Sequence, residues 1–148
     1  MANPNYEPDW LGRIYGVQWR DYIGVNKKGK TVHLDQLAEL IKTLKKDPQS
    51  RRMGVTAWNP VEFEQLCLPP CHSWFQCNVT SEGRLNLAVY LRSLDLFLGA
   101  PFDIASYAAL MLIIAELTGY KAGNMTMMVG SAHIYEAHYA AVEELLQR

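Results

Sequence analysis

The stretch Leu68-Pro69-Pro70-Cys71-His72 leads directly into the alternating run Ser73-Trp74-Phe75-Gln76-Cys77-Asn78-Val79. Two adjacent prolines remove two backbone donors and fix φ, so the segment before Cys71 is neither helix nor central strand. The alternation of apolar and polar residues that follows predicts a strand. We therefore expect Cys71 where a rigid turn enters a strand, a place that can present its thiol at the rim of a pocket. The alternative is that Cys71 is a small buried hydrophobic residue.

Around this stretch, helix-like and strand-like patterns alternate irregularly, which predicts an α+β fold with a mostly antiparallel sheet. Residues Phe102 to Thr118 are apolar almost all round, and this predicts a long buried central helix that Gly119 caps. We expect one domain over residues 1–148, with the polar residues 1–9 flexible. The other expected elements are helices near 34–46, 59–66 and 135–147, strands at 52–58 and 124–129, and a hairpin of 74–79 with 85–91.

The composition argues against several classes of partner. A net charge of −1 provides no electrostatic footprint for nucleic acid or an anionic membrane, so an anionic partner should be small and bound by a few arginines. The cysteines at 67, 71 and 77 form neither a disulfide framework nor a four-ligand metal site. No signal peptide is recognised, and the apolar run from Ile104 to Leu117 is broken by polar residues and too short to span a bilayer. These features indicate a cytoplasmic protein without a bound metal.

Further blocks of sequence carry a resemblance to a known family. They are Arg51-Arg52, the run from Leu91-Arg92-Ser93-Leu94-Asp95 to Phe102-Asp103-Ile104-Ala105-Ser106-Tyr107-Ala108, and His133-Ile134-Tyr135. Together with Pro69-Pro70-Cys71-His72, their order and spacing resemble the thymidylate synthase family, which includes the dCMP and CMP hydroxymethylases. The resemblance runs from about Gly12 to Glu143 and implies a thymidylate synthase-like fold.

The resemblance implies a catalytic role for three of these residues. Cys71 matches the nucleophile whose thiolate adds to C6 of a pyrimidine, which makes C5 reactive toward an electrophilic one-carbon unit. Arg92 matches a guanidinium that lowers the pKa of the thiol and also binds phosphate. His72, next to the nucleophile, is expected to provide a supporting hydrogen bond.

The resemblance also implies the binding residues. Arg51, Arg52 and Ser93 match phosphate ligands, and the arginine pair of the family reaches into the partner's site, which implies a homodimer. From the residues alone, Arg51-Arg52 is a solvated strand start, and only the motif favours a role in binding. The remaining matches are His133 and Tyr135 for the sugar hydroxyl, and Asp95, Leu98 and Gly99 for the folate wall, with 5,10-methylenetetrahydrofolate as co-substrate.

Asp103 departs from the pattern of thymidylate synthases, which have Asn at this place to read the uracil edge. Cytosine reverses that edge, and a carboxyl accepts from N4 and, if protonated, donates to N3. In the family, Asp here accompanies cytidylate substrates. The alternative is that Asp103 only caps the helix that begins nearby.

Other departures concern activity. The family usually has Gln at Leu91, Asp at Ser131 and an aromatic pair at Cys77-Asn78. We expect no counterpart here of the upstream segment with the catalytic glutamate or of the C-terminal lid, and Glu62 and Glu64 do not match that glutamate.

The sequence as a whole predicts a homodimeric one-carbon transferase that hydroxymethylates C5 of CMP or dCMP. One alternative is a thymidylate synthase that acts on dUMP. Another is a catalytically silent protein that binds pyrimidine nucleotides. The sequence decides neither between ribose and deoxyribose nor between a methyl and a hydroxymethyl product.

Overall fold

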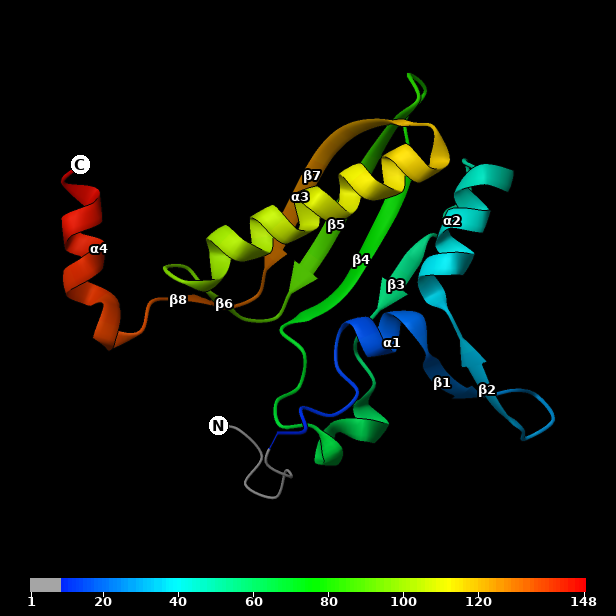
Figure 1. The fold of residues 1–148 in the computed structure, drawn as a ribbon, viewed down its shortest axis with the longest axis horizontal. Coiled ribbons are helices and arrows are strands. Elements are labelled where there is room, and N and C mark those ends of the chain that lie inside the picture. The colour runs from blue at the N-terminus through cyan, green and yellow to red at the C-terminus, as the bar shows by residue number, and fades with distance from the viewer. Residues whose placement is uncertain (1–8) are drawn as a thin grey trace.

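The computed structural model describes residues 9–148, and a four-stranded sheet forms its centre (Figure 1). The strand order is β3–β4–β5–β7, in which β3–β4 and β4–β5 are antiparallel and β5–β7 is parallel. The strands of this sheet are β3 (Gly54–Thr56), β4 (His72–Val79), β5 (Arg84–Leu91) and β7 (Lys121–Val129). The sheet is therefore mixed, with two of its three pairings as predicted for a mostly antiparallel sheet.

The β4–β5 hairpin is the part of the sheet that the sequence pattern dictates most directly. Alternate residues of β5 are buried, as are Phe75 and Cys77 of β4, because successive side chains of a strand point to opposite faces. Gly83 adopts a positive φ of 70° in the turn, a conformation that costs glycine little. The predicted hairpin is confirmed, and its buried row on β5 consists of residues 85, 87, 89 and 91.

Four α-helices and two 3₁₀ segments accompany the sheet within residues 9–148. Asp35 accepts a hydrogen bond from the backbone N–H of Ala38 at 2.9 Å and so caps the predicted helix α2. Helix α3 ends at Gly119, whose φ of 79° is left-handed, as predicted. The helical bounds are α1 Gly16–Arg20, α2 Gln36–Lys46, η1 Pro60–Gln65, α3 Gly99–Thr118, η2 Glu136–His138 and α4 Tyr139–Leu146.

Helix α3 crosses one face of the sheet and connects β5, through β6, to β7 (Figure 1). Only Tyr107, Met111, Ile114 and Ala115 of this helix are buried, so the expected burial all round is not confirmed. Helix α3 is also long and apolar enough to cross a membrane by length and composition alone, a test that core helices of soluble proteins pass as well. The prediction that this run is too short to span a bilayer was wrong, because the helix begins at Gly99.

The remaining elements lie at the periphery. Two short pairs, β1 (Tyr22–Val25) with β2 (Thr31–Leu34) and β6 (Leu94–Asp95) with β8 (Ala132–His133), were not predicted. The C-terminal helix is a 3₁₀ turn followed by α4, which stands apart from the sheet (Figure 1). The prediction for residues 1–9 falls outside the described residues except at Asp9.

Two phenylalanines provide a matched test of this core. Phe75 is fully buried, whereas Phe102 on α3 is 74% exposed. Phe75→Ala should lower the free energy of unfolding by about 3–5 kcal/mol through lost contacts and a cavity, and Phe102→Ala should change it by less than about 0.5 kcal/mol. Urea unfolding followed by circular dichroism measures both. A large loss for Phe102→Ala would mean that another surface covers α3 in solution.

Candidate functional site

Cys71 lies between the proline turn and β4, and its backbone is fixed on both sides. The Cys71 carbonyl accepts a hydrogen bond from the backbone N–H of Arg92 at 2.9 Å. The Cys71 N–H donates to the Tyr15 hydroxyl at 3.0 Å. The thiol is free and partly exposed. Cys71 thus lies where the sequence predicts it, at the point where a rigid turn enters a strand.

Arg92 follows β5 and its guanidinium turns toward the proline turn. Its Nε donates to the Pro70 carbonyl at 2.9 Å and its Nη2 to the Pro69 carbonyl at 2.6 Å. The guanidinium carbon is also 6.0 Å from the centre of the Trp58 ring, within the range of a cation–π contact. Neither proline has an N–H, so the turn donates no backbone hydrogen bond at Pro69 or Pro70. The carbonyls of both residues instead accept charge-assisted hydrogen bonds from the guanidinium.

His72 and Asp103 contact each other beside Cys71, with 3.0 Å between His72 Nε2 and Asp103 Oδ1. Both side chains are about four-fifths buried. Helix α3 begins at Gly99 because Pro101 fits the first turn, where its missing N–H has no partner to lose. Asp103 therefore lies in the second turn and does not cap the helix. The alternative role of Asp103 as a cap was wrong.

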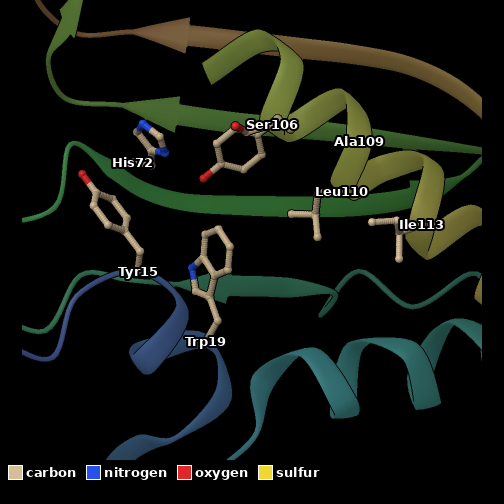
Figure 2. A pocket seen from close by; sticks show the side chains of 8 residues that line it. Tyr15, Trp19, His72, Ser106, Ala109, Leu110 and Ile113 are labelled. Atoms are coloured by element: carbon tan, nitrogen blue, oxygen red, sulfur yellow. The ribbon is translucent and has the colours of Figure 1, made fainter. Parts of the chain in front are cut away.

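A cleft of about 410 Å³ opens beside this pair, between α1 and α3 (Figure 2). Figure 2 shows Tyr15 and Trp19 facing His72 and the side chains of α3 across it. The ring of Tyr15 is 5.0 Å from that of His72, centre to centre. The lining is mainly apolar and consists of Tyr15, Trp19, His72, Ser106, Tyr107, Ala109, Leu110 and Ile113.

Tyr15 and Tyr107 are site residues that the sequence did not reveal. Burial, more than any other cause, raises the pKa of both phenols, and the Asp103 carboxylate adds to the effect. Both hydroxyls therefore keep their protons at neutral pH, and that of Tyr15 lies next to Cys71. No local signal points to Tyr15, because 56 residues separate it from Cys71.

The residues matched to a folate wall and to a sugar hydroxyl lie next to one another. The backbone of Asp95 lies opposite that of His133 in the parallel pairing of β6 with β8. Asp95 Oδ1 accepts from the N–H groups of Phe97 at 3.0 Å and Leu98 at 3.3 Å. Leu98 is half exposed, and the ring centres of His133 and Tyr135 are 4.9 Å apart. Gly99 begins α3 close to Asp103: a Cβ on it would lie 3.7 Å from Asp103 Oδ2.

Arg51 and Arg52 are the predicted site residues that the structure does not bring near Cys71. They are exposed and precede Met53, whose carbonyl accepts from the Cys77 N–H at 2.9 Å. Cys77 is six residues along β4 from Cys71, which amounts to about 20 Å at 3.3 Å per residue. Ser93, by contrast, directly follows Arg92 and is partly buried.

The three cysteines differ in environment, and thiol labelling should reflect this. Burial raises the pKa of Cys77 to about 12, so this thiol stays protonated and shielded. At pH 8, iodoacetamide should modify Cys71 first and leave Cys77 intact until the protein unfolds. Peptide mapping by mass spectrometry measures each site. Faster labelling of Cys67 or Cys77 than of Cys71 would remove the case for Cys71 as the reactive thiol.

The site contains a thiol, a guanidinium and a carboxylate–imidazole pair, and residues 9–148 contain no cluster of three or more side chains that suits a metal ion. A family model described as thymidylate synthase matches residues 3–148. That match covers nearly the whole chain, including the proline turn, Cys71 and α3. Members of this family are one-carbon transferases that act on C5 of a pyrimidine nucleotide with methylenetetrahydrofolate as co-substrate. This chain belongs to the thymidylate synthase family.

Proposed function

We propose that this protein transfers a one-carbon unit to C5 of a cytidine monophosphate and releases a hydroxymethylated nucleotide. The observation that carries the proposal is the His72–Asp103 pair, which sets a carboxylate beside Cys71. A carboxylate in this position favours the edge of cytosine over that of uracil.

Cys71 supplies the nucleophile in this proposal. Its thiolate adds to C6 of the ring, the C5–C6 π electrons move toward the ring carbonyl, and C5 becomes nucleophilic. After C5 has taken up the one-carbon unit and lost its proton, tetrahydrofolate would leave and water would supply the hydroxyl group. Elimination of the thiolate would then restore the aromatic ring. The Tyr15 hydroxyl, which hydrogen-bonds to Cys71 and stays protonated, stabilises the thiolate before addition and after elimination.

Asp103 has the geometry to read the base. One carboxylate oxygen, Oδ1, is occupied by His72, which leaves Oδ2 to accept a hydrogen bond from the N4 amino group. Uracil has a carbonyl oxygen at the same place, and two acceptors would then face each other with no proton between them. The contact with His72, which itself lines the cleft, holds the Asp103 carboxylate in place.

The residues at the start of α3 fit the co-substrate. Methylenetetrahydrofolate supplies the one-carbon unit when it is bound. Asp95 Oδ1 is used by backbone N–H groups, so Oδ2 remains for the ring donors of a pterin, and the half-exposed Leu98 offers an apolar wall. The chemistry of this donor set agrees with the group that the family uses.

Two observations support a homodimer with a shared phosphate site. Arg51 and Arg52 are about 20 Å along β4 from Cys71, too far to bind the same nucleotide in one chain. On the sheet, Trp74 pairs with Tyr90 and Tyr90 with Met128, and all three side chains are exposed. Such a row of large apolar side chains across three strands is typical of an interface.

Base selectivity tests the role of Asp103. The parent protein should bind dCMP roughly ten- to a hundred-fold more tightly than dUMP, because facing acceptors cost roughly 1–3 kcal/mol. Asp103→Asn should abolish or reverse this preference, since an amide both donates and accepts. Isothermal titration of each protein with each nucleotide measures the ratio. The control is Asp47→Asn, an exposed change at the end of α2 that should leave the ratio unaltered.

Equal affinities for dCMP and dUMP in the parent protein would contradict the cytidylate assignment and favour the thymidylate synthase alternative. Release of tritium from C5 of labelled dCMP, with methylenetetrahydrofolate present, tests turnover separately. Nucleotide binding without tritium release would favour the silent binding protein.

Mixed dimers test the shared site. Arg51→Ala chains and Cys71→Ala chains should each be inactive alone, yet a mixed dimer should regain one native site and up to half of the parental activity per dimer. Tritium release from purified heterodimers that carry two different affinity tags measures this recovery. A protein that sediments as a monomer would contradict the shared site directly.

A further inference from the structure

A side-chain cluster outside the cleft holds the segment on which Tyr15 lies. Glu62, on η1, contacts one residue on each side of this tyrosine, Arg13 before it and Gln18 after it. Its Oε1 is 3.4 Å from Arg13 Nε, and its other oxygen accepts a hydrogen bond from Gln18 Nε2. Gln18 Nε2 also donates to the Arg13 carbonyl at 2.7 Å. The Glu62 carboxylate thus contacts both ends of segment 13–18, and Gln18 joins these two ends to each other.

This cluster is shielded from water, so its contacts are weakly screened. Gln18 is fully buried, and the side chains of Glu62 and Arg13 are 12% and 24% exposed. The far end of the Arg13 guanidinium is fixed as well, because its Nη1 is 3.1 Å from Asp21 Oδ2. His33 Nδ1 in turn lies 2.6 Å from Asp21 Oδ1. The guanidinium therefore bridges two carboxylates from different elements.

Tyr15 requires such support because its backbone is in an unfavourable conformation. Its φ is 40° with ψ at −106°, and positive φ is rare for a bulky residue. No side-chain cap stabilises the start of α1 at this residue. The chain before it is pressed against the end of η1, where a Cβ on Gly12 would lie 2.7 Å from Leu66 Cδ2. Surrounding contacts must therefore keep Tyr15 in place.

We propose that Glu62 is a positioning residue for Cys71, which acts by fixing Arg13 and Gln18 so that the Tyr15 hydroxyl stays against the thiol. The inference rests on the proposed function in one respect, the role of Cys71 as nucleophile. Glu62 itself touches neither the thiol nor the cleft lining; its effect passes through Tyr15. A double-mutant cycle between Glu62 and Tyr15 therefore separates positioning from a general loss of stability.

The experiment measures the alkylation rate of Cys71 at pH 7.5 by peptide mapping, without nucleotide. Tyr15→Phe and Glu62→Ala should each slow alkylation by roughly ten- to a hundred-fold, the effect expected when one hydrogen bond to a charged group is lost. In the Tyr15→Phe background, Glu62→Ala should slow it by less than about two-fold. Glu62→Gln, which keeps the size of the side chain, should have an intermediate effect.

Glu39→Ala serves as the matched control, since it removes an exposed carboxylate paired with Lys42 on α2. It should leave the alkylation rate unchanged. Parental rates in both Glu62 variants, or equal slowing by Glu62→Ala with and without the Tyr15 hydroxyl, would overturn the proposal. If Glu62→Ala fails to fold by circular dichroism, the cycle is run with Glu62→Gln. The alkylation rate needs neither substrate nor turnover. It therefore tests the role of Glu62 even if the proposed activity is absent.

Discussion

The rest of the site depends on the contact between the Arg92 guanidinium and the carbonyls of Pro69 and Pro70. The two prolines make the turn rigid but leave it without N–H donors at these two positions, so there the turn can be joined to the sheet only through its carbonyls. Arg92 anchors these carbonyls from the end of β5, and its backbone N–H also binds the Cys71 carbonyl. Charge-assisted hydrogen bonds are about twice as strong as neutral ones, which suits a position where a thiol must be fixed.

Around this anchor, the described residues are arranged so that a thiolate at Cys71 would not face an unpaired carboxylate of the His72–Asp103 pair. Asp103 is already paired with His72, and the phenols of Tyr15 and Tyr107 keep their protons because burial raises their pKa values. A negative charge on sulfur would meet hydrogen-bond donors instead of other anions. The low polarity of the adjacent cleft strengthens each of these interactions.

The sequence predicted what is local and missed what is assembled from distant segments. The β4–β5 hairpin and the Asp35 cap follow from alternation and from a capping residue, both of which act within a few positions. The predicted bounds of α3 were nearly right, but a sequence that is apolar on all sides of a helix does not indicate which segments cover that helix. Asp103 was placed one helical turn too early, because Gly99 already begins the helix. Tyr15 was not identified as a site residue, since its partner lies far along the chain.

The wide sequence separation of Tyr15, Cys71 and Asp103 has a consequence for how the site forms. Cys71 and Arg92 flank the β4–β5 hairpin, whose contacts are local and quick to form, whereas Tyr15 must close a loop of more than fifty residues. Contacts of such long range generally form slowly. The parallel pairing of β5 with β7 likewise requires the long crossover through α3. The chemical reactivity of the Cys71 sulfur is therefore a property of the completed tertiary structure, and a refolding chain would acquire it only after most of its secondary structure.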